Sequence, residues 1–267
     1  MLFKGHPLSG NILGTKASVR KISRDELLRF VKDQFRPARM AFSIVADIDE
    51  KVMEKHVLKL AEKYFPEGDA DAPETRKTSA PSAEPFDITL NKRNHQANCI
   101  IGGLAPSLYE ERERLTAVLL CNILGGPANN SILNAVLREK NGWVYGVECG
   151  YTQYADTGIV AISLGCDKSN LDKCLGAIDR ELAKLQEIPL SDRKLKAAKK
   201  QLLGQLAISG DNGETQCLSM GKSLLAYGRI SGDKETRELV EKISAADIQE
   251  MANTVFNIQT LSKLVYI

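Results

Sequence analysis

The sequence predicts an α+β domain, in which an antiparallel sheet carries helices packed on one face. Short apolar or alternating runs in residues 86–104 are typical of two strands, and residues 143–151 and 157–166 indicate a hairpin around Gln153–Asp156. Between and after these runs, apolar residues recur at spacings of three and four, which favours amphipathic helices. The resulting order of strands, helices, strands, helices and strand favours a layered domain over alternating βα units.

The first elements along the chain are a helix, a short strand and a second helix. Ser23 with an acid three residues later, Glu26, is a capping-box pattern that predicts a helix start, and an apolar strand follows within residues 22–45. The next predicted helix is Glu50–Tyr64. Residues 66–85 are rich in Pro, Ala, Asp, Glu and Ser without apolar periodicity, which predicts a linker.

The later elements surround the predicted hairpin. Helices are predicted at 109–124 and 131–140 before it, and Ser169 with Asp172 predicts a capped helix after it. Three further helices are predicted at 191–207, 214–228 and 234–242. A last helix and a terminal strand follow them.

Residues 22–45 and 243–266 have the same pattern of cap, helix and strand. They begin with Ile22-Ser23 and Ile243-Ser244, a shift of 221 residues, and apolar positions coincide along both segments. Two unrelated units with a common cap would also read this way. An internal duplication instead predicts three parts: the C-terminal part of a first domain at 1–65, the linker at 66–85 and a complete second domain at 86–267.

Composition excludes several classes of function. The formal net charge of +2 gives no reason to expect a nucleic-acid partner, and no apolar run approaches the length of a membrane span. Six cysteines occur without a C-x-x-C pair, mostly inside apolar runs, so we interpret them as free thiols. Free thiols favour a reducing, cytoplasmic compartment, although the sequence does not otherwise indicate the location.

No catalytic or metal-binding motif is found. The three histidines, His6, His56 and His95, lie far apart, and none has the partners that a zinc site of three or four ligands needs. The G-x-S-x-G pattern of a serine nucleophile is also missing. The sequence therefore predicts neither a catalytic residue nor a metal ligand in this chain.

Arg138 and Tyr145 are the candidate substrate-binding residues. They lie on either side of Gly142 in LREKNGWVYG, where a helix is predicted to end and a strand to begin. Both could be structural, as a cation at a helix C-terminus and an aromatic residue in a strand. If the turn directs both into one cleft, Arg138 offers a planar fork of donors to a peptide carbonyl or carboxylate, and Tyr145 one donor to a carbonyl oxygen.

Two blocks of sequence resemble the M16 zinc metallopeptidases, the family of insulin-degrading enzyme, pitrilysin and mitochondrial processing peptidase. The first block is GHPLSGNILGT with ISRDELLRFVKDQFRPARMAFSIVADID and LAEKYFP. The second is ILGGPANNSILNAVLREKNGWVYGVECGYTQYADTGIVAISLGC at 123–166, which is similar to the C-terminal domain of that family. The resemblance implies tandem homologous α+β domains that close around a peptide.

The resemblance also implies a division of labour between the domains. In the family, zinc is held in the first domain by an H-x-x-E-H motif and a downstream Glu, and neither has a match in this sequence. Arg138 and Tyr145 correspond to the family residues that reach the substrate from the opposite wall. We therefore expect the substrate-binding portion of a zinc metalloendopeptidase, a hydrolase whose zinc belongs to the parent protein, and expect this chain alone to be inactive. Its partners would be a peptide or unfolded polypeptide and the missing catalytic domain or a second M16 subunit. The alternative is a naturally zinc-free subunit that serves a catalytic subunit as partner or scaffold.

Overall fold

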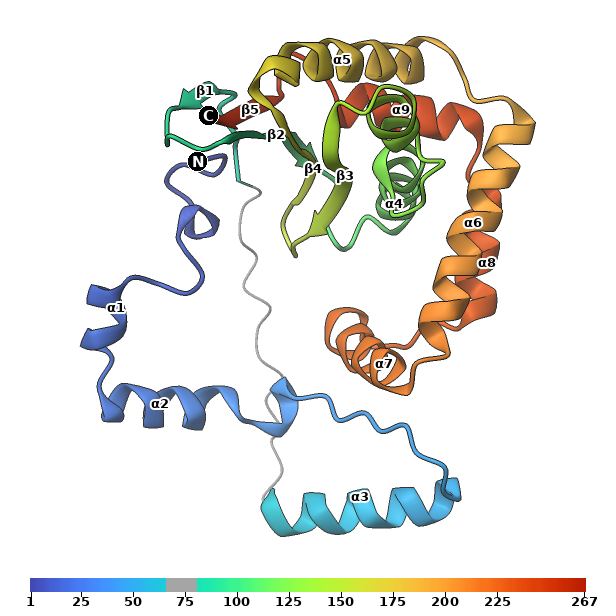
Figure 1. Ribbon diagram of the computed structural model, residues 1–267. Helices are drawn as coiled ribbons and strands as arrows, with labels where there is room; N and C mark the ends of the chain where they lie inside the picture. The colour runs from blue at the N-terminus through green and yellow to red at the C-terminus, as the bar shows by residue number, and fades with distance from the viewer. Residues whose placement is uncertain (66–80) are drawn as a thin grey trace. The chain divides into compact units, whose positions relative to one another are not determined.

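The computed structural model describes residues 1–65 and 81–267 (Figure 1). The predicted linker therefore lies mostly outside the described residues. The helices are α1 (Lys16–Lys21), α2 (Arg24–Gln34), α3 (Glu50–Tyr64), α4 (Glu111–Gly125), a π-helix at Asn134–Lys140, α5 (Leu171–Glu187), α6 (Asp192–Gly210), α7 (Gly213–Tyr227), α8 (Asp233–Lys242) and α9 (Ala245–Val255), with 3-10 turns at Pro7–Ser9, Pro37–Arg39 and Lys168–Asn170. The strands are β1 (Asp87–Leu90), β2 (Gln96–Ala105), β3 (Val144–Gln153), β4 (Gly158–Asp167) and β5 (Ser262–Tyr266).

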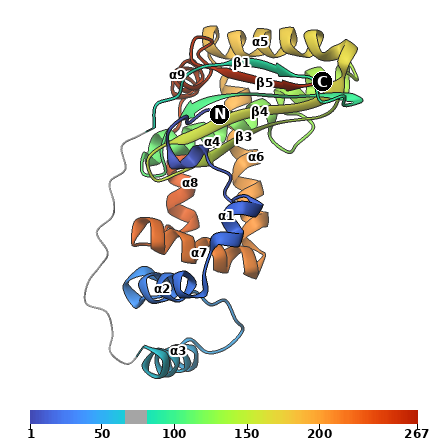
Figure 2. The ribbon, with the colours of Figure 1, turned by 90° about the vertical axis from the view of Figure 1, so that its left-hand side faces the viewer.

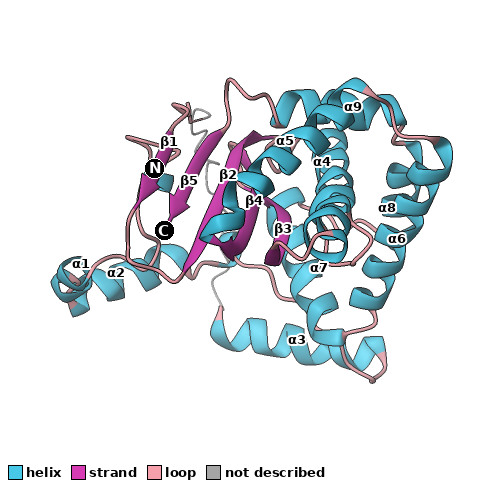
Figure 3. Cartoon of the chain, turned by 45° about the horizontal axis from the view of Figure 1, so that its top comes forward, coloured by secondary structure: helices cyan, strands magenta, loops and turns pink. Residues whose placement is uncertain are grey.

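The five strands form one sheet in the order β1-β5-β2-β4-β3 (Figure 3). Three of the four pairings are antiparallel, including the predicted hairpin of β3 and β4. The pairing of β1 with β5 is parallel, which the sequence did not predict. No hairpin joins these two strands, because most of the domain lies between them, so their relative direction is not set by a turn. The predicted α+β class is confirmed.

Helices cover one face of the sheet. The helices α4, α5 and α9 lie on one side of the sheet (Figure 1). Val160, Ile162, Leu164 and Cys166 of β4 are buried in one core cluster with residues of these helices, while the alternate residues of the strand are less buried, as expected when they point to the other face. On that second side lie the N-terminal residues Met1–Gly10 (Figures 1 and 2). We call this second side of the sheet the open face, because no α-helix among the described residues of the sheet-containing unit covers it.

The described residues divide into two compact units. The first contains Met1–Gly10, 81–204 and Lys234–Ile267, and therefore the whole sheet and its buried core. The second contains 11–65 and Gln205–Asp233, and its helices α1, α2, α3 and α7 have no buried residue. The predicted boundary between a first domain at 1–65 and a second domain at 86–267 stays a prediction.

The helix of the repeat is present in both copies, but the strand predicted within residues 22–45 is wrong. Residues 41–46 form no strand, because no described segment pairs with them, whereas the second copy ends in β5. A shift of 221 residues carries α2 onto α9 at both ends, and the caps of both helices, at Ser23 and Ser244, form complete capping boxes. In each box the serine hydroxyl accepts from the third backbone N–H, and the acid, Glu26 or Asp247, accepts from the serine N–H.

Two local predictions need correction. The helix expected at 131–140 is a π-helix over Asn134–Lys140. The spacing of apolar residues does not distinguish the wider turns of a π-helix from those of an α-helix. The cap expected at Ser169 is wrong as well. Ser169 lies inside a 3-10 turn, and Asn170 precedes α5 without a side-chain cap.

Candidate substrate-binding site

Tyr145 lies where the pairing of β3 with β4 is irregular. Val144 is opposite Cys166 and Gly146 is opposite Gly165, so Tyr145 has no partner in the register and occupies a β-bulge. The side chain of Val144 points into the core, whereas that of Tyr145 is 58% exposed. The bulge thus presents the ring of Tyr145 to the surface at one end of the sheet.

Asp167 fixes the hydroxyl of Tyr145. The phenol donates a hydrogen bond of 2.7 Å to Oδ1 of Asp167, the last residue of β4, which is opposite Gln96 at the start of β2. This bond to the carboxylate is the main reason that the pKa of Tyr145 is raised, and a side-chain hydrogen bond to Gln96 opposes the rise. Tyr145, Asp167 and Gln96 therefore form one polar row across three neighbouring strands.

The bond to Asp167 changes what Tyr145 can do. A phenol has one hydroxyl hydrogen, and in this structure Tyr145 donates it in the hydrogen bond to Asp167. The oxygen of Tyr145 can therefore act toward a ligand only as a hydrogen-bond acceptor. Sequence reasoning gave Tyr145 the role of a donor to a carbonyl oxygen, which requires the phenol to leave Asp167 first. Sequence reasoning also missed Asp167 and Gln96. The predicted hairpin contained a signal for Asp167, because pairing 143–151 with 157–166 brings the end of the second strand beside Tyr145.

Arg138 is exposed on the π-helix that precedes β3. Among residues 1–65 and 81–267, its guanidinium has no hydrogen-bond or ion-pair partner. No hydrogen bond joins Arg138 to Tyr145 in the same part of the structure, and their predicted convergence stays a prediction. A free guanidinium keeps all five donors available to an incoming ligand.

The turn between the two residues depends on Gly142. Its φ is +62°, a left-handed conformation that favours glycine, and its N–H donates to the carbonyl of Arg138 over 2.9 Å. This arrangement closes the helix end, and the chain enters β3 at Val144 two residues later. Buried Leu133 and Leu137 hold the π-helix on the core, which leaves Arg138 at the surface.

Cys99 and Cys174 are unsuited to nucleophilic chemistry. All six are free thiols, as the sequence predicted, and five of them are buried. Burial raises the pKa of Cys99 to about 11 and that of Cys174 to about 12. Because the thiolate is the reactive form, these thiols are unreactive at neutral pH and serve as small apolar residues of the core.

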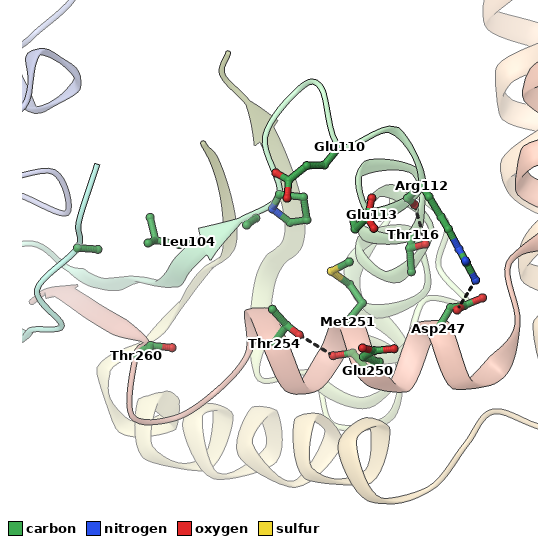
Figure 4. A pocket seen from close by; sticks show the side chains of 13 residues that line it. Leu104, Glu110, Arg112, Glu113, Thr116, Asp247, Glu250, Met251, Thr254 and Thr260 are labelled. Atoms are coloured by element: carbon green, nitrogen blue, oxygen red, sulfur yellow. Dashed lines mark hydrogen bonds and ion pairs between the residues drawn. The ribbon is translucent and has the colours of Figure 1, made fainter. Parts of the chain in front are cut away.

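A cavity of about 750 Å³ lies elsewhere in the sheet-containing unit, between the end of β2, the start of α4 and α9 (Figure 4). Arg112 crosses it to form an ion pair of 2.8 Å with Asp247, which is also the cap acid of α9. Neither Arg138 nor Tyr145 lines this cavity. Its ion pair between Arg112 and Asp247 joins α4 to α9, and we place the candidate site at Tyr145.

The described residues contain no group of three or more His, Cys, Asp and Glu side chains that could hold a metal ion. His6 is engaged locally, with Nδ1 accepting from the N–H of Leu8 and Nε2 lying 3.7 Å from Asp156. Among the helices of the described residues, none combines the length and the apolar character needed to cross a membrane.

Comparison with known proteins decides the family. The family described as peptidase M16 inactive domain matches residues 21–202, more than half of the chain. The chain belongs to this family. Among curated relatives of this M16 chain, an uncharacterized zinc protease of Rickettsia bellii is 25% identical over 99% of the chain and 62% of its own length. A probable mitochondrial-processing peptidase subunit beta of Schizosaccharomyces pombe is 24% identical over 94% of the chain and 56% of its own length.

Solved structures of low identity show the same fold. The crystal structure of a peptidase M16 inactive domain from Pseudomonas fluorescens has a TM-score of 0.82 at 18% identity, covering 99% of this chain and 62% of that one. A chain of Complex III2 from Candida albicans has a TM-score of 0.81 at 17% identity, and the match covers 99% of this chain and 64% of that one. The M16 chain thus spans about 60% of the length of the proteins that it matches.

Proposed function

We propose that this chain is the C-terminal, non-zinc portion of an M16-type zinc metalloendopeptidase, and that the open face around Tyr145 forms a peptide-binding wall of its cleavage chamber. The observation that carries the proposal is the hydroxyl of Tyr145, held at the open face by Asp167 over 2.7 Å. A tyrosine that only filled space in a strand would need no such partner. The relatives named zinc proteases support the class of the parent protein.

The chemistry of the site fits an extended peptide. The guanidinium of Arg138 can donate two parallel hydrogen bonds to a carboxylate or bind a backbone carbonyl. The oxygen of Tyr145, which donates to Asp167, can accept a backbone N–H of the same peptide. Donor and acceptor together match the alternating groups of a peptide backbone, which favours binding with little dependence on side chains.

The site can bind and orient a peptide, but it cannot cleave one. Residues 1–65 and 81–267 contain no cluster of side chains that fits a zinc site, which is the usual means of activating water in this class of enzyme. We therefore assign bond cleavage to residues outside this chain. The second candidate function is a zinc-free subunit that assembles with a catalytic one, which is favoured by relatives named as subunits of the mitochondrial-processing peptidase.

Peptide binding by the chain tests the first candidate. We expect fluorescein-labelled, mixed-sequence decapeptides to bind the chain, with affinity measured by fluorescence anisotropy. Arg138→Ala should weaken binding roughly 10-fold or more, because a hydrogen bond to a charged group contributes about 1.5–3 kcal/mol. Tyr145→Phe should weaken it about 2- to 10-fold, since a neutral hydrogen bond contributes about 0.5–1.5 kcal/mol.

Lys140→Ala is the matched control for Arg138→Ala, because it removes an exposed positive charge two residues away on the same π-helix. It should leave the affinity within about twofold, since an exposed charge contributes little. If Arg138→Ala and Lys140→Ala have the same effect, the role of Arg138 is wrong. If the wild-type chain binds no peptide, the scaffold function is favoured instead.

A further inference from the structure

The cavity between α4 and α9 combines apolar surface with acidic side chains. Its volume of about 750 Å³ is that of a small-molecule site, and all of its lining residues belong to the sheet-containing unit. Met251, which is 7% exposed, gives the cavity apolar surface together with Leu104 and Pro106. Carboxylates reach the cavity from both helices, Glu113 from α4 and Glu250 from α9, and Met251 lies between them in the view of Figure 4.

The carboxylates of Glu113 and Glu250 have no counter-charge. Within the described part of the chain, neither side chain has a hydrogen-bond or ion-pair partner. Arg112 is the one basic residue among the described residues that line the cavity, and it is paired with Asp247 over 2.8 Å. Three and four residues from Glu250 along α9 there is no Lys or Arg, and Asp247 at this spacing adds a like charge to the same face of the helix.

The electrostatics of helix ends accounts for only part of this charge. Glu110 and Glu113 lie at the start of α4, where the partial positive charge of a helix N-terminus favours acids, and Glu110 also accepts from the N–H of Ser107 over 2.6 Å. Glu250 lies beyond the first turn of α9, so the N-terminus of that helix does not stabilise it. The lining contains four acidic side chains and one Arg, which gives it a formal charge of −3.

The distribution of the charge indicates the shape of a matching ligand. The carboxylates are spread around the cavity rather than gathered at one point, since no three of the described acidic side chains form a group that could hold a metal ion. Apolar surface lies between them. A ligand that matches both properties is elongated and carries several ammonium groups joined by methylene chains, because methylenes are stable on apolar surface and ammonium groups bind carboxylates.

We propose that this cavity binds a linear aliphatic polyamine. Two ammonium groups of the ligand donate charge-assisted hydrogen bonds to the carboxylates of Glu113 and Glu250. The methylene chain between them lies on Met251 and extends toward Leu104. The site is distinct from the one at Tyr145, and the proposal is independent of peptide binding there.

Isothermal titration calorimetry on the full chain tests the proposal, with spermidine as the probe. We expect one spermidine to bind per chain. Methylamine should bind at least about 10-fold more weakly, because its single ammonium group loses a charge-assisted hydrogen bond. Hexaamminecobalt(III), a compact cation with the full charge of spermidine but no methylene chain, should also bind at least about 10-fold more weakly. Equal affinity for spermidine and the cobalt complex would reduce the cavity to a general attractor of cations and overturn the proposal.

Two further outcomes would also overturn it. One is the absence of spermidine binding to the wild-type chain. The other is an affinity for tetralysine at least about 10-fold higher than that for spermidine, which would identify the ligand as a basic polypeptide instead of a free polyamine.

Variants locate the binding in the cavity. Glu250→Gln and Glu113→Gln each keep the shape of the side chain and should weaken spermidine binding about 10-fold or more. Glu187→Gln, which removes an exposed carboxylate at the end of α5, is the matched control and should change the affinity less than about twofold. The same loss in all three variants would show that the effect is general charge reduction and would contradict the proposal.

The two carboxylates lie on different helices, so Glu113→Gln still decides if Glu250→Gln does not fold. Both variants should bind the decapeptides like the wild type. Decapeptide binding without spermidine binding would therefore refute the polyamine site alone, and the reverse would refute the peptide-binding proposal alone.

Discussion

Residues 22–45 and 243–266 form helices of the same length with the same capping box, yet one copy is buried and the other is exposed. The difference shows which properties are local. Caps and helix bounds depend on neighbouring residues and are the same in both copies. Burial and strand pairing depend on distant elements, which only the second copy has in the described part of the chain.

The largest expected difference between the copies is the cost of removing a phenylalanine. Phe256→Ala should lower the free energy of unfolding by about 3–5 kcal/mol, because it leaves a cavity in a packed core. Phe35→Ala should change it by only about 0.5 kcal/mol, since that ring is already exposed.

Urea unfolding can follow each copy separately. Trp143 is the only tryptophan and packs against the core of the sheet-containing unit, so its fluorescence reports Phe256→Ala. Phe35→Ala is followed by far-UV circular dichroism and by amide exchange of α2. Equal costs at Phe35 and Phe256 would mean that Phe35 is buried in the isolated chain, which contradicts its exposure of 57%.

The same contrast explains how far the sequence predicted the molecule. The capping boxes placed the starts of α2 and α9 correctly, because the signal and the structure are both local. The parallel pairing of β1 with β5 could not be predicted, since no turn connects them. The role of Tyr145 in the candidate site stays a prediction. The bulge that exposes Tyr145 and its bond to Asp167 could not be predicted, because both depend on strand register, which one residue can shift.

The second expected difference is smaller and concerns the caps. Ser244→Ala should lower the free energy of unfolding by about 1 kcal/mol, because the N–H of Asp247 loses its acceptor. Ser23→Ala removes the equivalent bond to the N–H of Glu26 and should destabilise α2 locally by a similar amount. The Trp143 melt should report only Ser244→Ala, while amide exchange in the first turn of α2 reports Ser23→Ala. Ser→Asp at each position keeps an acceptor oxygen and should restore most of the loss, and a failure to do so would show that the capping bond is not the cause.

The smallest expected effect is the response of the caps to acid. The backbone N–H of Ser244 is the main cause that lowers the pKa of Asp247, assisted by the serine hydroxyl and Arg112, and the backbone N–H of Ser23 likewise lowers that of Glu26. A carboxylate whose pKa is lower in the folded state stabilises that state above its unfolded pKa. This contribution decreases as the pH falls below the unfolded pKa of about 4 and is lost as the pH passes through the lower folded pKa.

Asp247→Asn isolates this contribution, because an amide keeps the shape of the carboxylate but does not titrate. The wild type should be more stable than Asp247→Asn at pH 6, and the two should converge as the pH falls below about 4 in Trp143-monitored urea melts. Glu26→Gln should show the same convergence only in amide exchange of α2, because Glu26 is fully exposed and far from Trp143 in sequence. A difference between the wild type and Asp247→Asn that stays constant from pH 6 to pH 3 would mean that the charge of Asp247 does not stabilise α9. The two capping boxes would then be alike in geometry but would draw their stability from the hydroxyl of the serine alone.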